Sequence, residues 1–186
     1  MIARLLRPRP LPALLGIVAL AALVLWSIGR PAICTCGSVA LWGLVGPEQS
    51  QMIADWYTPS HIVHGFLFFG LLHIAAPRWP VERRFLAALV VEAAWEIVEN
   101  TPLIIDRYRE TTIALGYSGD SILNSVSDIV AMALGFWAAR RVPVWASVAL
   151  VLSLELVALI AIRDNLALNI LMLIAPIEAV NAWQAR

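Results

Sequence analysis

The sequence predicts an all-α protein, a polytopic membrane bundle of about six transmembrane helices that forms one integral membrane domain over residues 1–186. Hydrophobic residues make up 61% of the chain, and the mean hydropathy is +0.81. Apolar runs long enough to cross a bilayer recur between short polar segments. All 13 basic residues are arginines, and they lie in loops or at the termini. The chain has no room for a separate soluble catalytic domain, so any chemistry belongs to the bundle or its loops.

The expected spans cover about residues 11–28, 60–76, 85–100, 120–139, 144–162 and 166–182. Arg4, Arg7 and Arg9 precede the first span, and no small-x-small cleavage motif follows it. This pattern predicts an uncleaved anchor with a cytoplasmic N-terminus. Between the first two spans, the apolar segment from Ser38 to Val45 is too short to cross and is expected to be re-entrant or to lie at the interface.

Proline residues mark the bounds of the second and third spans. Thr58 is the expected N-cap of the second span, with Pro59 at its first helical position, and Pro77 follows its end. The third span is expected to stop at Asn100-Thr101-Pro102, because the residue before a proline disfavours helix.

The second half of the chain predicts a polar outer loop over residues 106–119 and three further spans. The last span is short and is interrupted by Pro176. This threading places both termini in the cytoplasm, with nine arginines inside and four outside, in agreement with the positive-inside rule.

Three glutamates form a stripe on the expected third span. Glu92, Glu96 and Glu99 are spaced by four and then three residues, so they lie on one face of a helix. A carboxylate in hydrocarbon is costly unless it is neutralised, paired or next to water. The stripe therefore predicts a polar cavity inside the bundle.

Two other spans bring polar residues to the same outer half of the membrane. The expected layers are a rim of His61, Glu99 and Asp120, a middle layer of His64, Glu96 and Asn124, and a floor of Glu92 and Asp128. The layers would be roughly 6 Å apart, because a helix rises about 1.5 Å per residue. The prediction is a funnel that opens to the external side.

The funnel offers the ligand types of a transition-metal site. The candidate metal ligands are His61, His64, Glu96, Glu99 and Asp128, and the candidate catalytic residues are Glu96, Glu99, Asp120 and Asn124. Zinc or iron suits this mixture of imidazole and carboxylate. The same residue types also serve proton relays and cation binding in transporters, or hold helices together.

Other polar residues have simpler explanations. Cys34 and Cys36 are either small packed residues, an oxidised pair or contributors to a metal site. His73 stands alone near the inner end of the second span and is expected to be structural. A further set, expected to make a separate polar contact, contains Glu155, Asn169 and Glu178.

Three segments carry a resemblance to a known family: Trp56 to Gly65, Glu92 to Pro102, and Gly116 to Ser125. Together they resemble an uncharacterised bacterial multi-pass inner-membrane family, classified as a domain of unknown function. The helix-borne His, the Glu-rich helix and the Asp-x-x-x-Asn helix are also distantly similar to VanZ-like membrane proteins. The resemblance implies a multi-pass protein of the bacterial cell inner membrane and brings no established reaction.

Two classes of function fit these patterns, and a third remains open. The first is a metal-assisted membrane enzyme that acts on a lipid or lipid-linked substrate, with Glu96 or Glu99 taking a proton in hydrolysis. The second is a small transporter or a cation- or proton-binding protein. The third is a structural partner in the envelope without catalysis. Nucleic acid is excluded as a partner because the arginines are scattered and the net charge is zero.

Overall fold

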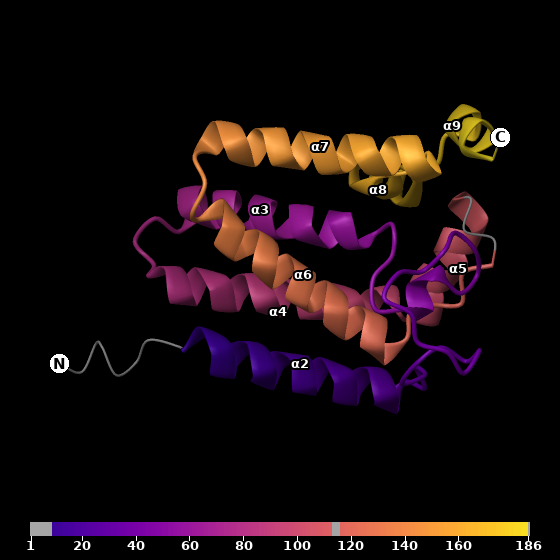
Figure 1. The fold of residues 1–186 in the computed structure, drawn as a ribbon, viewed down its shortest axis with the longest axis horizontal. Helices are drawn as coiled ribbons and strands as arrows, with labels where there is room; N and C mark the ends of the chain where they lie inside the picture. Colours follow the sequence, from indigo (N-terminus) through magenta and orange to yellow (C-terminus); the bar gives the residue numbers. More distant parts are fainter. Residues whose placement is uncertain (1–8, 113–115, 186) are drawn as a thin grey trace.

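The structure, a computed structural model, describes residues 9–112 and 116–185. Five long helices run antiparallel along one another: α2 (Pro10–Ser27), α3 (Thr58–Ala75), α4 (Val81–Glu99), α6 (Ile122–Ala139) and α7 (Val144–Ile162) (Figure 1). The only β feature among the described residues is a single bridge between Trp42 and Ala54. The all-α prediction is confirmed, and five expected spans coincide with these helices to within a few residues. Arg4, Arg7 and Arg186, which were expected on the cytoplasmic side, lie outside the described residues.

The predicted sixth span is wrong. Residues 166–182 fall into two short helices, α8 (Leu166–Ile174) and α9 (Glu178–Gln184), with a break at Ala175 and Pro176. A helix of nine residues is only about 14 Å long, whereas the hydrocarbon core is about 30 Å thick. Pro176 ends α8 because proline lacks an N–H and disfavours helix in the preceding residue. The chain consequently ends at the end of the bundle opposite to the start of α2 (Figure 1), and the expected cytoplasmic C-terminus loses its basis.

The predicted outer loop over residues 106–119 begins as a helix. Helix α5 (Pro102–Thr111) follows α4 after two residues, Asn100 and Thr101, and Pro102 is its first residue. Thr101 adopts the extended backbone of an N-cap, so this start repeats the Thr-Pro pattern seen at the start of α3. The helix buries Ile105 and Tyr108 against the rest of the structure.

The segment between α2 and α3 has little regular structure. Residues 38–45 form no helix, and Leu41 and Leu44 are 80% and 83% exposed. Cys34 and Cys36 are joined by a disulfide. Among the three alternatives for the cysteines, the structure thus has the oxidised pair, and neither sulfur is free to bind a metal.

Glycines allow α3 and α6 to cross in close contact. A Cβ atom on Gly65 would overlap the backbone of Met132 and Phe136, and one on Gly135 would overlap the carbonyl of Ile62. Small residues at such a crossing let helix backbones pack directly. This close approach fixes the relative position of the two helices that begin at the site.

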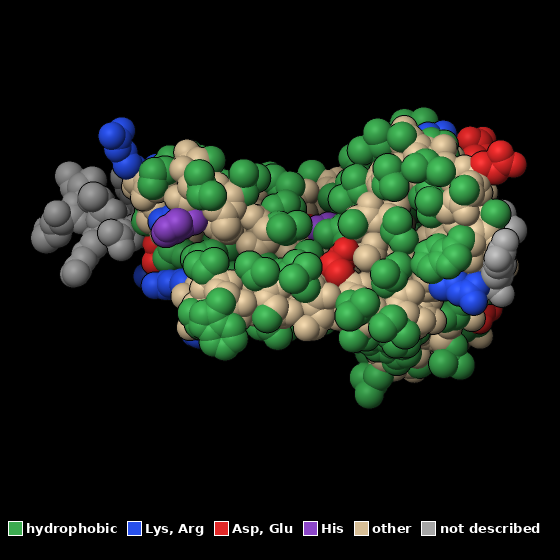
Figure 2. Space-filling model, turned by 90° about the horizontal axis from the view of Figure 1, so that it is seen from above, with side chains coloured by type: hydrophobic (Ala, Val, Ile, Leu, Met, Phe, Trp, Pro, Cys, Tyr) green, Lys and Arg blue, Asp and Glu red, His purple; other side chains and the backbone are tan. Residues whose placement is uncertain are grey.

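Three helices, α2, α6 and α7, are long and apolar enough to cross a membrane by length and composition. Helices α3 and α4 have similar lengths but carry the polar residues that face the bundle interior. Figure 2 shows the basic side chains gathered toward the two ends of the molecule, with a mainly hydrophobic surface between them. On α7, Val144 and Ile160 are 81% and 74% exposed. Such large exposed apolar faces require an apolar neighbour.

Candidate functional site

A cavity of about 220 Å³ lies where α3 and α6 begin and α4 ends. Its polar lining comes from Gln49, Ser50, Asp55, Tyr57, His61, Glu99, Tyr108, Tyr117, Asp120, Asn124, Asp128 and Asn169. Four of these residues are carboxylic acids, and no arginine is among the described lining residues. A concentration of carboxylates without a basic partner favours a positively charged occupant.

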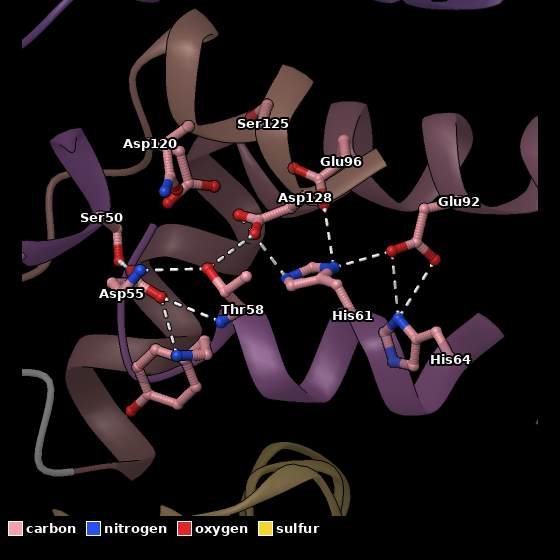
Figure 3. Close-up of polar contacts among 12 residues, drawn as sticks. Ser50, Asp55, Thr58, His61, His64, Glu92, Glu96, Asp120, Ser125 and Asp128 are labelled. Carbon is pink, nitrogen blue, oxygen red and sulfur yellow. Dashed lines mark hydrogen bonds and ion pairs between the residues drawn. The ribbon is translucent and has the colours of Figure 1, made fainter. Parts of the chain in front are cut away.

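His61 lies at the inner end of this cavity, between three carboxylates (Figure 3). Its Nδ1 donates to Glu92 Oε1 at 2.7 Å and lies 3.4 Å from Glu96 Oε1. On the other side of the ring, Nε2 is 3.8 Å from Asp128 Oδ2. An ionised carboxylate only accepts hydrogen bonds, so Nδ1 carries the proton. In the neutral ring Nε2 is therefore free to bind a metal.

Glu92 connects the two histidines of α3. It is fully buried, and its carboxylate also accepts from His64 Nδ1 at 3.1 Å. The His64 ring stacks on Phe68 and does not line the cavity. The structure therefore places His64 outside the cavity, in a group with Glu92 and His61 whose ligand atoms lie within 4.8 Å of one another.

Glu96 is buried at 1% exposure, and its Oε1 atom has no hydrogen-bond partner. One of its oxygens lies in a group with ligand atoms of His61 and Asp128, all within 4.8 Å of one another. Another group with the same limit joins Glu96 to Glu99 and Asp120. A buried carboxylate oxygen without a partner is unfavourable, so this atom marks a place where a cation would bind.

Asp128 is oriented by the start of α3. Its Oδ1 accepts from the Thr58 hydroxyl at 3.1 Å. Tyr57 is the N-cap of α3, and Asp55 Oδ1, two residues earlier, accepts from the N–H groups of Tyr57 and Thr58 at 2.7 and 3.2 Å. The prediction of Thr58 as the N-cap is therefore wrong. Asp55 was missed, although Asp55-x-x-Thr58 before Pro59 has the spacing of a capping box.

Asp120 is held at the outer part of the cavity. Its Oδ2 accepts from Asn100 Nδ2 at 2.8 Å, and its Oδ1 accepts from the Tyr117 hydroxyl at 3.0 Å. Burial raises the pKa of the Asp120 carboxyl to about 6. Arg30 binds the Asp120 backbone carbonyl through Nε and Nη2, at 3.0 and 2.9 Å. The guanidinium of Arg30 therefore contacts the Asp120 backbone and leaves the Asp120 carboxylate without a basic partner.

Asn124 lines the cavity, but its amide is engaged elsewhere. Its Nδ2 donates to the Met52 carbonyl at 3.0 Å, and its N–H donates to Ser121, which caps α6. The predicted middle layer of His64, Glu96 and Asn124 is therefore not formed, and Asn124 holds the loop before α3 against α6.

The predicted floor is wrong as well, because Asp128 faces His61 and Thr58 while Glu92 faces the two histidines. His61 lies level with Glu92 and Asp128 because α3 begins deeper in the bundle than α4 ends and α6 begins. The expected layers assumed that these three helix ends are level.

Two short helices and a loop complete the outer wall. The Tyr108 hydroxyl donates to Asn169 Oδ1 at 3.0 Å and lies against Glu99. Tyr57 donates to Asp164 Oδ2 at 3.0 Å, beside the start of α8. These residues come from α5, the loop before α3 and the α7–α8 turn. Asn169 was expected to make a separate contact and instead lines the site.

The remaining polar candidates lie apart from the cavity. Glu155 accepts from the N–H groups of Leu166 and Ala167 at the start of α8, a separate contact as expected. His73 accepts from Arg84 at 3.0 Å and stacks on Phe69, which fits the structural role expected for it.

The chain is similar to several bacterial proteins. A UPF0314 protein of Paracoccus denitrificans is 56% identical over 96% of this chain and 94% of its own length. UPF0314 proteins of Sphingopyxis alaskensis and Novosphingobium aromaticivorans are 54% and 51% identical, over 91% and 92% of this chain and 92% and 90% of their own. No solved structure matches the chain.

The family described as Protein of unknown function (DUF2585) matches residues 25–186. The expected resemblance to an uncharacterised bacterial family is confirmed, whereas the more distant likeness to VanZ-like proteins is not shown. The chain belongs to the family of proteins of unknown function DUF2585.

Proposed function

We propose that this protein is a multi-pass protein of the bacterial inner membrane in which all five long helices cross the bilayer. The turns α3–α4 and α6–α7 and the first turn of α4 carry arginines at the end where α2 begins: Arg78, Arg83, Arg84, Arg140 and Arg141. The positive-inside rule makes this end cytoplasmic. The cavity lies at the opposite, external end.

The site supports a bound divalent metal ion best, held by His61, Glu96 and Asp128. The observation that carries this proposal is the buried Glu96 Oε1 atom, which has no hydrogen-bond partner and lies 3.4 Å from His61 Nδ1, in a residue grouped with His61 and Asp128. One imidazole and two carboxylates suit zinc or iron(II), and an open coordination position remains for water or substrate.

Hydrolysis is the chemistry that this arrangement serves. A bound ion supplies a polarised water at neutral pH. Glu99 lies half-buried in the cavity wall, where it accepts the proton of the attacking water and returns it to the leaving oxygen. The bond between substrate and leaving oxygen breaks as the water oxygen adds.

The surroundings of the cavity favour a lipid-linked substrate. Val45, Gly46 and Pro47 line the cavity, and the exposed Leu41 and Leu44 lie in the same segment. An amphiphile fits this combination, with its polar group in the acidic cavity and its apolar tail along the exposed side chains.

A transport function receives less support. A path through the bundle would need polar groups toward the cytoplasmic end. The bundle there is filled by buried side chains, among them Phe85, Leu89, Met132 and Phe136. His73, near that end, is held by Arg84.

The test is hydrolysis in reconstituted vesicles of phosphatidylethanolamine and phosphatidylglycerol that carry fluorescent-tailed phospholipids and isoprenyl phosphates. We expect zinc- or iron-dependent product in thin-layer chromatography with the wild type and with Glu110→Gln, an exposed control, but none with Glu96→Gln. Metal-dependent uptake of zinc into the vesicles without any product would contradict the enzyme proposal and favour transport.

A further inference from the structure

We propose that Glu96 bridges two metal positions, so that the site is a two-ion centre whose second ion is held by Glu96, Glu99 and Asp120. This inference rests on the proposed function and adds the number of ions and the substrate class. Two groups of ligand atoms, each within 4.8 Å, share Glu96. One contains His61 and Asp128, and the other contains Glu99 and Asp120.

The position of Glu96 explains how one carboxylate serves both groups. Glu96 and Glu99 are three residues apart on α4 and so lie on one face. His61 lies 3.4 Å from Glu96, and the Asp128 carboxylate lies between Glu96 and Asp120 (Figure 3). A carboxylate has two oxygens, and paired catalytic ions are about 3.5–4 Å apart, a spacing that one carboxylate spans.

The hydrogen bonds of the outer group leave its carboxylates able to bind an ion. Each Asp120 oxygen accepts one bond, from Asn100 or Tyr117, and a carboxylate offers about four acceptor positions. Asp120 therefore keeps both bonds while it binds a metal, and both partners orient it. Glu99 lies against the Tyr108 hydroxyl in the same way. Bound through one oxygen, Glu99 retains the other for proton transfer.

The charge of the outer group requires a cation or protons. Glu96, Glu99 and Asp120 place three carboxylates within 4.8 Å of one another. Arg30 binds the backbone carbonyl of Asp120 instead of its carboxylate. Glu96 Oε1, which is buried, lies 3.4 Å from His61 Nδ1 in the first group. The other Glu96 oxygen would bind a second divalent ion, which offsets the repulsion in the outer group.

Two ions determine the substrate class. No arginine is among the described lining residues, so the cavity offers no guanidinium to neutralise a phosphate. A pair of metal ions binds a phosphate and stabilises both the attacking and the leaving oxygen in an in-line displacement. The substrate class is therefore a lipid-linked phosphate ester, hydrolysed to an alcohol and a phosphate.

Metal stoichiometry tests this inference without any substrate. The full-length protein in detergent is loaded with zinc, freed of excess metal and measured by mass spectrometry. We expect about two ions per chain in the wild type and about one in Glu99→Gln and Asp120→Asn. Glu110→Gln and Asp106→Asn are matched controls on exposed positions of α5 and should keep both ions.

Manganese provides the second readout. Two manganese ions bridged by Glu96 should give a spin-coupled paramagnetic resonance spectrum, and Glu99→Gln should convert it to that of an isolated ion. Circular dichroism checks that each variant is helical; if Asp120→Asn does not fold, the half-buried Glu99→Gln decides the question.

Two outcomes would overturn the inference. The first is one zinc per chain in both the wild type and Glu99→Gln, with that zinc lost in His61→Ala. This result would contradict the second ion and leave the proposed function intact. No metal in folded wild type contradicts both, and the three outer carboxylates are then neutralised by protons.

Discussion

Glu92 provides a specific test of how the proposed metal ligand His61 is positioned. Glu92 does not line the cavity, but it accepts the Nδ1 proton of His61 at 2.7 Å and that of His64 at 3.1 Å. Holding the proton on Nδ1 leaves Nε2 for the metal and fixes the plane of the ring. Glu92→Gln keeps the shape of the side chain, removes the negative charge and leaves one oxygen to accept from two histidines.

The expected effect is a weaker metal site in a folded protein. Loss of a carboxylate behind a metal-bound histidine typically lowers metal affinity 10- to 100-fold, which corresponds to about 1.4–2.8 kcal/mol. The upper half of this range is expected here, because Glu92 is fully buried and water cannot replace the lost interaction.

Competition with a fluorescent zinc chelator measures this change in detergent solution. Glu110→Gln, with its exposed side chain, is the control for loss of one carboxylate and should bind as the wild type does. Unchanged affinity in Glu92→Gln would refute the positioning of His61 by Glu92. Complete loss of metal, as expected for His61→Ala, would show that Glu92 is itself a ligand.

Three further predictions concern the fold. Gly65→Ala should lower stability by roughly 1–3 kcal/mol, because its Cβ overlaps the α6 backbone. Thermal unfolding in detergent should show no such loss for Gly70→Ala, which meets no atom within 4 Å. Burial raises the pKa of Asp164 above the value of about 3.9 in the unfolded chain. The neutral acid is therefore favoured in the folded state, and stability falls as pH rises through the folded-state pKa. The melting temperature of the wild type should fall relative to Asp164→Asn as pH rises above about 4, and a pH-independent difference would contradict this. A reporter fused to the C-terminus should be active outside the cytoplasm, since five crossings separate the chain ends; cytoplasmic activity would restore an even number of crossings.

The long helices were predictable because hydrophobic runs and their bounding residues report directly on helix position. The errors arose where hydropathy was used without local geometry. Residues 166–182 are apolar enough for a span, but the break at Ala175 and Pro176 leaves pieces too short to cross. Helix α5 was missed although Thr101-Pro102 repeats the signal of Thr58-Pro59, because its polar composition was taken as a loop.

Half of the site was also predictable, because helical spacing alone places Glu92, Glu96 and Glu99 on one face. Their partners required the tertiary structure. Tyr108 and Asn169 come from two short helices whose packing no periodicity reveals. The depth at which each helix begins also decides which partners meet, and this offset is lost when residues are counted from a common end.

X-ray absorption at the zinc edge of the loaded protein tests the central claim most directly, because it reports the atoms bound to the ion. The account predicts a shell of oxygen and nitrogen near 2.0–2.1 Å, with imidazole scattering that disappears in His61→Ala. A sulfur shell near 2.3 Å, which would place the ion at Cys34 and Cys36, or imidazole scattering that survives in His61→Ala would contradict it.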